Sequence, residues 1–319
     1  MISATLISLL LLAFTNISNG QTKEDATNAY NRGVELASSD LPKAIEALIQ
    51  AADVASKATD AADIQKMAED QIPLLQYNYA TSLYKEKKLA ESIDNFILAY
   101  DYAVKYNDNS TRAKASDLLP KLYLSKGNSE MNDGELDKAI ASAEKAISYD
   151  STYAKAYLIK GLALNKQGKA DDMKVALDKA IMLGKTTNDE KTVATAGKIL
   201  VNGYVNDANA AFQAGKFSEV VSLTNEAIKY ADDNADAYYL SALANNKLSN
   251  WDDAISAAEK GLTVEENTAA KLSRFYFELG MAQAGKNDTG AACASFKKAT
   301  IGPLAESANY QINTVLKCN

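Results

Sequence analysis

The chain contains no histidine among its 319 residues, and this absence removes a large part of catalytic chemistry. Without an imidazole there can be no Ser-His-Asp triad, no Cys-His pair and no metalloprotease zinc motif with two histidines. Acidic residues are plentiful, but solvated helix faces are their ordinary place, and no motif spaces two of them for acid–base catalysis. The sequence therefore predicts a protein that is not an enzyme, with no catalytic residue, no metal site and no cofactor.

Basic residues and prolines are also scarce. Lys and Arg number 34 against 41 Asp and Glu, a net charge of −7, whereas a general nucleic-acid binder usually has a basic excess. Only four prolines are present, alanine is frequent, and hydrophobic residues make up 47% of the chain. This composition favours an ordered, helical protein that does not bind nucleic acid, because proline breaks helices and alanine has the highest helix propensity.

No apolar run is long enough to cross a bilayer, which takes about twenty residues. Residues 7–14 are apolar apart from one serine, and the small residues Ser18 and Gly20 follow. This pattern predicts a secretory signal peptide over residues 1–20, with a mature chain that begins at Gln21; the alternative is an N-terminal core helix. No cysteine lies near the cut for lipid attachment. We therefore expect a periplasmic or secreted protein with no membrane span, and in particular the periplasm of a bacterium with two membranes.

The two cysteines, Cys293 and Cys318, are enough for a single disulfide in an exported protein. If they lie on adjacent antiparallel helices with the turn near Gly302, Cys318 falls about two helical turns beyond the point opposite Cys293. A disulfide therefore requires that the C-terminal tail fold back. The alternative is two free thiols.

The tripeptide Gly184-Lys185-Thr186 resembles the end of a phosphate-binding loop but lacks the rest of that motif. A P-loop also has a glycine five residues before its second glycine, and Lys179 stands there instead. No strand is expected before the tripeptide either. Gly184 is better explained as the cap at the end of a helix.

An internal repeat of 34 residues is the strongest feature of the sequence. Residues 122–150 align with residues 156–184 at this offset, with Gly127 opposite Gly161. Equivalent small residues recur along most of the chain, at Gly33, Ala80, Gly127, Gly161, Ala208, Ala242 and Gly280. Each repeat also has a second small residue later in its sequence, at Ala51, Ala99, Ala146, Ala180, Ala227, Gly261 and Ala299. Small side chains at fixed places let two helices approach each other closely.

This pattern resembles the tetratricopeptide repeat family, in which each repeat is a pair of antiparallel helices. The resemblance implies an all-α fold: an α-α superhelix, or tetratricopeptide solenoid, of about seven helix-turn-helix repeats with a C-terminal capping helix. We expect the solenoid to span residues 21–302 and the capping helix to span residues 303–319. The repeats are expected near residues 26–57, 73–106, 120–153, 154–187, 201–234, 235–268 and 273–302.

The spacing of the repeats departs from the family pattern in places. The first small residues of successive repeats lie 47, 47, 34, 47, 34 and 38 residues apart, so we expect the extra residues to lengthen some helices. Pro73 and Pro120 stand at the first position of their repeats, where they start or kink a helix. Met173 and Val220 replace a small residue of the family pattern, and we expect looser packing around them.

In the tetratricopeptide repeat family, the first helix of each repeat lines a concave groove that binds a segment of a partner. The residues carried over to that face of this chain are aromatic residues, asparagines and lysines. The candidate partner-binding residues are Tyr30, Tyr77, Tyr84, Lys85, Asn128, Asn165, Lys166, Asn209, Phe212, Tyr239, Asn246, Lys247 and Phe277. Asparagine offers both donors and an acceptor to a peptide backbone. The alternative is that the rings pack against neighbouring repeats and the asparagines contact only water.

The charges expected on this face are mostly positive. Its acidic residue is Asp236, and its basic residues are Lys85, Lys121, Lys155, Lys166, Lys247 and Arg274. A concave surface of one sign attracts partners of the opposite sign. We therefore expect another protein to bind through an acidic or carboxylate-ended segment, unless the lysines point sideways into solvent.

These features together predict a protein–protein interaction scaffold or adaptor of the bacterial cell envelope, without enzymatic activity. The alternative is a solenoid that binds a carbohydrate or another small ligand through its tyrosines. Glycan binding favours tryptophans in the groove, and Trp251, the one tryptophan of the chain, falls at a repeat-packing position. An enzyme with an unrecognised carboxylate site is a third hypothesis.

Overall fold

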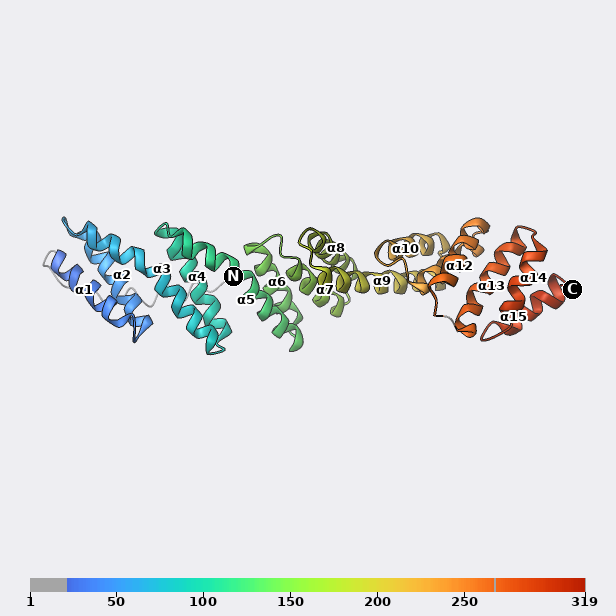
Figure 1. Cartoon of the computed structure of the whole chain (residues 1–319), viewed down its shortest axis with the longest axis horizontal. Helices are drawn as coiled ribbons and strands as arrows, with labels where there is room; N and C mark the ends of the chain where they lie inside the picture. The colour runs from blue at the N-terminus through green and yellow to red at the C-terminus, as the bar shows by residue number, and fades with distance from the viewer. Residues whose placement is uncertain (1–21, 267, 319) are drawn as a thin grey trace. The chain divides into compact units, whose positions relative to one another are not determined.

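A computed structural model describes residues 22–266 and 268–318, and in these residues helices alternate with short loops (Figure 1). The described chain divides into two compact units. Unit 1 contains residues 22–130 and 145–151, and unit 2 contains the remaining described residues. None of the described helices combines the length and apolarity needed to cross a membrane.

Unit 1 is a series of antiparallel helices that pack in chain order. The first two helices form a pair that packs against the pair formed by the third and fourth helices, and the first helix also contacts the third. The last residues of α6 join this unit through Tyr149, whose ring stacks on that of Tyr123 with 5.9 Å between centroids. Its helices are α1 (Lys23–Leu36), α2 (Leu41–Lys57), α3 (Ala62–Lys85), α4 (Leu89–Lys105), α5 (Asn109–Asn132) up to Glu130, and the end of α6 (Leu136–Tyr149).

Unit 2 repeats the same arrangement. Its helices pair as α7 with α8, α9 with α10, α11 with α12 and α13 with α14, and each pair packs against the next. They are α7 (Ala154–Lys166), α8 (Ala170–Thr186), α9 (Glu190–Gln213), α10 (Phe217–Tyr230), α11 (Ala235–Lys247), α12 (Trp251–Val264), α13 (Ala269–Gly285), α14 (Thr289–Lys298) and α15 (Ala305–Tyr310), and the unit also contains the last two residues of α5 and α6 as far as Glu144. The expected all-α solenoid of helix pairs is therefore confirmed.

From α3 onward, the first helices of the pairs end in a common way, with a left-handed residue two positions after the helix. Glycine fills this position after α5, α7 and α9, where Gly134, Gly168 and Gly215 have φ between 73° and 80°. Glycine adopts this conformation without a steric cost. After α3, α11 and α13 the position is filled by residues with side chains: Lys87, Ser249 and Asn287.

The extra residues between repeats lie in the helices themselves. Helices α7 and α11 have 13 residues each, whereas α3, α5 and α9 have 24 residues each. Pro73 and Pro120 are buried inside two of these long helices, α3 and α5, so neither proline starts a helix. In the family pattern, both prolines stand at the first position of a repeat. In this chain that position lies inside a longer helix.

Small residues form close contacts between neighbouring helices, both within a pair and between successive pairs. A Cβ atom added to Gly161 would lie 2.4 Å from Cδ2 of Leu177, and one added to Gly261 would lie 2.0 Å from Cε1 of Phe275. Met173 is only 2% exposed, so the looser packing expected around it is not found. The reason is that Gly203, a Cβ of which would lie 3.3 Å from Cε of Met173, makes room for the longer side chain. Val220 is likewise fully buried.

The C-terminal segment differs from the single capping helix expected over residues 303–319. The α-helix α15 stops at Tyr310, and a π-helical turn, η1 (Gln311–Val315), follows it. Lys317 then has a φ of 50°, and the backbone N–H of Cys318 donates to the carbonyl of Ile312 at 2.8 Å. This turn folds the tail back, and Cys318 forms a disulfide with Cys293 of α14, with 5.8 Å between the Cα atoms.

Candidate partner-binding site

In unit 1, the candidate residues fall on α1, α3 and α5. The Tyr30 hydroxyl accepts a hydrogen bond from the Gln71 amide at 2.5 Å. The Tyr77 ring packs edge-on against Phe96 with 5.1 Å between centroids. Tyr84 is 50% exposed. The remaining two candidates of this unit are Lys85, which is exposed, and Asn128, which is half-buried.

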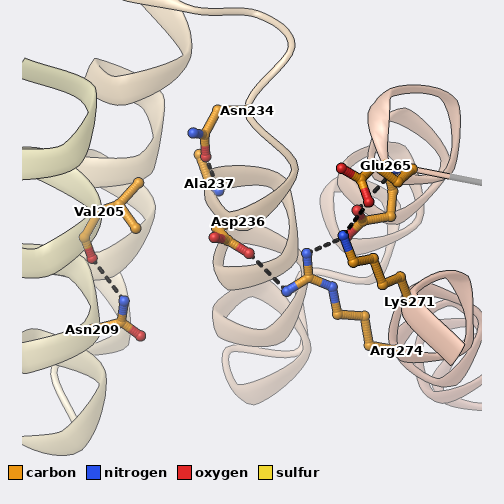
Figure 2. Close-up of polar contacts among 9 residues, drawn as sticks. Val205, Asn209, Asn234, Asp236, Ala237, Glu265, Lys271 and Arg274 are labelled. Carbon is orange, nitrogen blue, oxygen red and sulfur yellow. Dashed lines mark hydrogen bonds and ion pairs between the residues drawn. The ribbon is translucent and has the colours of Figure 1, made fainter. Parts of the chain in front are cut away.

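In unit 2, several candidates contact other residues of their own chain. The Phe212 ring lies 5.3 Å from Phe217, and the Phe277 ring lies 5.5 Å from Phe296. The amide of Asn209 donates to the carbonyl of Val205 one turn earlier, at 3.0 Å (Figure 2). At the end of α7, the candidates Asn165 and Lys166 are both exposed. These rings therefore serve packing between helices, as the alternative interpretation of the sequence anticipates.

The densest polar arrangement lies between α11 and α13, around Arg274. Its guanidinium donates from Nη1 to Asp236 at 2.8 Å and from Nη2 to Glu265, so a cation from α13 joins two carboxylates (Figure 2). The same guanidinium lies 4.9 Å from the ring centroids of Tyr239 and Phe275. Cation–π contacts of this kind hold an arginine in place while leaving its edge able to donate.

A second polar contact joins the same two helices, one turn after Arg274 on α13. The Asn246 amide donates from Nδ2 to the Glu278 carboxylate at 2.8 Å and to the Glu278 carbonyl at 2.9 Å. Glu278 is only 3% exposed. Burial raises the pKa of the Glu278 carboxyl, although the hydrogen bond from Asn246 and the charge of Lys247 act in the opposite direction. Burial also raises the pKa of the Tyr239 hydroxyl, and the Glu278 charge adds to that effect.

Two buried atoms of this surface have no hydrogen-bond partner within the described protein. They are Oδ1 of Asn246, an acceptor, and Nε of Arg274, a donor. The orientation of the Asn246 amide follows from its neighbours, because both Glu278 atoms that face Nδ2 are acceptors. A buried polar atom without a partner is costly. Both atoms lie inside the protein, so the described structure carries this cost at Asn246 and at Arg274.

A cavity of about 660 Å³ opens beside this arrangement. Tyr239 and Arg274 line it together with the N-terminal residues of α11, and so do Glu265 and Lys271. The sequence pattern did not single out Glu265 or Lys271, because neither stands at a family groove position. A larger cavity of about 910 Å³, lined by residues of α6, α7 and α8, contains none of the candidate residues.

The candidate face carries less unpaired positive charge than the number of its basic residues suggests, because some of them form ion pairs. Lys121 pairs with Asp117 at 2.7 Å, and Lys155 lies 3.8 Å from Asp189. Arg274 is already paired, as described above. The three lysines that form no ion pair with other described residues are Lys85, Lys166 and Lys247. Each is exposed and is the last residue of a first helix, where a cation is also favoured by the helix dipole.

The described residues contain no group of three or more cysteines, aspartates and glutamates placed to hold a metal ion. The chemistry available on the candidate face is therefore that of hydrogen bonds, ring contacts and exposed ammonium groups.

Part of the sequence matches a known protein family. Residues 124–172 and 206–270 match the model of the tetratricopeptide repeat family. No curated protein matches the sequence. Similar solved structures include MamA, at 23% identity over 62% of this chain and 96% of that chain, with a TM-score of 0.37. The TPR2AB domain of yeast Sti1 in its pHSP90 complex has 17% identity over 92% of this chain and 96% of that chain, with a TM-score of 0.35.

A tetratricopeptide repeat protein from Parabacteroides merdae ATCC 43184 has 17% identity over 93% of this chain and 100% of that chain, with a TM-score of 0.32. The family match covers parts of the repeats expected near residues 120–153, 154–187, 201–234 and 235–268. Residues 124–172 and 206–270 are therefore similar to tetratricopeptide repeats.

Proposed function

We propose that this tetratricopeptide repeat protein is a non-enzymatic scaffold or adaptor that binds a segment of another protein along the first helices of its repeats. The family match and the stacked helix pairs support a binding role, because a solenoid presents one face of many helices to a partner. The absence of histidine and of a catalytic motif in the sequence supports a role without chemistry.

The partner segment is acidic or ends in a carboxylate. The observation that carries this proposal is the set of three exposed lysines without an ion pair, Lys85, Lys166 and Lys247, at the ends of α3, α7 and α11. Ammonium groups that form no ion pair with a described carboxylate of their own chain can attract one from a partner.

The site of action is the bacterial cell envelope, and the protein is exported to the periplasm or secreted. Two observations support this part of the proposal. Residues 1–20 have the pattern of a cleaved signal peptide, and a structural disulfide joins Cys293 to Cys318. Disulfides persist in oxidising compartments and are rare in the cytosol.

The test is a kinetic binding measurement with the partner that mild crosslinking in the native envelope recovers. Changing Lys85, Lys166 and Lys247 to glutamate should lower the association rate at low salt by roughly tenfold or more. Each glutamate at a helix C-terminus should also cost about 0.3–1 kcal/mol of stability, so the rate is measured where the variant is fully folded. Wild-type binding should also weaken as salt rises.

The matched control carries the same change of charge on the second helices. Lys145, Lys179 and Lys260 are exposed, lie on α6, α8 and α12, and form no ion pair with other described residues. Their triple glutamate variant should bind almost as fast as the wild type. Equal association rates in both variants would show that the lysines of the first helices do not steer the partner, and recovery of a glycan instead of a protein would favour the carbohydrate alternative.

A further inference from the structure

Helix α8 exposes two large apolar side chains that lie seven residues apart. Val175 is 71% exposed, the largest fraction among the large hydrophobic residues of the described chain, and Met182 is 50% exposed. Seven residues are close to two helical turns, so both side chains lie on one side of the helix. The same two positions of the other second helices in this part of the chain carry Ala141 and Ser148 on α6, Ser222 and Lys229 on α10, and Ser256 and Thr263 on α12. The exposed apolar pair therefore distinguishes α8 from these three helices.

The charged residues on this side of α8 have opposite signs at the two ends of the helix. Asp172 lies in the first turn and Lys185 in the last turn, while Asp178 and Lys179 stand between the two apolar residues. All four are exposed. Asp172, Lys179 and Lys185 form no ion pair with other described residues. Asp178 accepts a hydrogen bond from the neutral hydroxyl of Tyr230.

This stripe of residues is complementary to itself when a second α8 runs antiparallel to it. In a contact with two-fold symmetry, residue i of one copy faces residue j of the other, and j faces i. With the axis between Asp178 and Lys179, Val175 of one copy faces Met182 of the other. In the same register Asp172 faces Lys185, and Asp178 faces Lys179. Each apolar residue thus meets an apolar one and each carboxylate meets an ammonium group, whereas a parallel pair would place like charges opposite each other.

The cavity of about 910 Å³ beside α8 gives a second helix a place to lie. Both exposed apolar residues of α8 line it. On its α6 side, the carboxylates are already bonded within the chain, because Glu144 pairs with Lys160 at 2.8 Å and Asp137 accepts from Gln167 at 2.9 Å. The charges that can still form ion pairs with a second copy therefore lie on α8.

We propose that two copies of this chain associate through α8 in this antiparallel register. Burial of Val175 and Met182 in both copies supplies the favourable free energy, and the facing charges fix the direction and the register. A contact of about one helix from each copy lies near or below the low end of stable interfaces, about 1,200 Å² in total, so we expect a reversible dimer with a dissociation constant in the micromolar range. The contact uses none of the candidate partner-binding residues. Partner binding measured below the micromolar range examines the monomer, so the two proposals fail separately.

Sedimentation velocity on the full chain, from about 1 to 100 µM, tests the dimer. The wild type should pass from monomer to dimer over this range. Val175→Ser with Met182→Thr, which gives α8 the residues of α12 at these positions, should weaken dimerisation at least tenfold. Leu98→Ser with Val104→Thr changes two residues of α4 that are 44% and 48% exposed, and should leave dimerisation unchanged. A wild type that stays monomeric, or an equal effect of the two folded variants, would overturn the proposal.

Two single charge reversals test the register at low salt. Asp172→Lys places two ammonium groups opposite each other and Lys185→Asp places two carboxylates, so each variant alone should dimerise at least tenfold more weakly than the wild type. In an equimolar mixture of the two variants, each changed residue faces the opposite charge, and the two unchanged residues face each other as before. Mixing should therefore restore dimers, which an effect on folding alone cannot do. A mixture of folded variants that stays monomeric would overturn the proposal.

Discussion

At the scale of single residues, this fold depends on the smallness of side chains where helices cross. Gly161 touches Leu177, and Gly261 touches Phe275, at distances that leave no space for a Cβ atom. Protein interiors are packed as tightly as organic crystals, so a larger side chain at such a crossing must push the helices apart. The sequence pattern located these positions correctly because smallness at a fixed spacing is visible without knowledge of the neighbour.

Gly161→Leu should therefore destabilise the protein by about 1–3 kcal/mol. The added side chain has to displace Leu177, whose Cδ2 atom would lie 2.4 Å from the new Cβ. Urea unfolding gives the free energy, and Lys169→Ala, an exposed change on the next loop, should stay within about 0.5 kcal/mol of the wild type. Equal midpoints for Gly161→Leu and the wild type would mean that the assigned helix crossing is wrong.

The Glu278 carboxylate gives a prediction about pH. Because burial raises its pKa, the native state holds this proton more tightly than the unfolded state does. Its contribution to stability is therefore favourable at low pH and is lost as pH rises through the raised pKa, at about 1.4 kcal/mol for each unit of the shift. Glu278→Gln removes this titration, and its side-chain amide can donate to the unpartnered Oδ1 of Asn246.

At pH 7, Glu278→Gln should accordingly be more stable than the wild type by about 1 kcal/mol. The difference should shrink as pH falls to about 4, the ordinary range of a glutamate pKa. Urea unfolding of both proteins at the two pH values measures this. If the two proteins differ in unfolding free energy by the same amount at both pH values, the Glu278 carboxylate does not titrate as the structure requires.

The candidate site was only partly accessible to sequence reasoning. Family positions place Tyr239, Asn246 and Arg274 on the first helices, but they do not reveal which atoms these side chains bond. The contact between Asn246 and Glu278 joins residues 32 positions apart and depends on two rotamers, for which no periodic signal exists. Glu265 lies at the C-terminal cap of α12 and was missed for the same reason.

At the scale of helices, the spacing of small residues carried most of the information. A gap of 47 residues instead of 34 correctly indicates longer helices, and α3, α5 and α9 each reach 24 residues. The C-terminal segment was harder, because its amphipathic pattern runs on past Tyr310 where the α-helix ends. The break depends on the left-handed backbone of Lys317 and on the bond to Cys293, both of which are tertiary features.

The disulfide should stabilise this C-terminal segment. It closes a loop with a sequence separation of 25, which corresponds to about 3 kcal/mol in the chain-entropy model. Replacing Cys293 and Cys318 by serine should lower the free energy of unfolding by about that amount and increase hydrogen exchange in α15 first. A thiol assay on the denatured, unreduced native protein should find no free thiol. Two reactive thiols would show that the bond does not form in the native compartment.

At the scale of the whole molecule, export remains the prediction that depends on the sequence alone. Its signal lies in residues 1–20, outside the described residues. If the interpretation is right, the native protein begins at Gln21, and its intact mass corresponds to residues 21–319 less two hydrogens for the disulfide. Measurement of that mass decides the matter. A mass that includes Met1 would contradict both cleavage and the export proposal that rests on it.

The order of helix contacts has a consequence for how the chain folds. Each described helix packs against helices that are next to it, or next but one, in the chain. Such contacts close short loops, which costs little entropy, and proteins rich in them fold quickly. No helix of unit 1 or unit 2 has to wait for a distant segment, so a chain synthesised from its N-terminus can complete each helix pair as soon as the second helix of that pair is available.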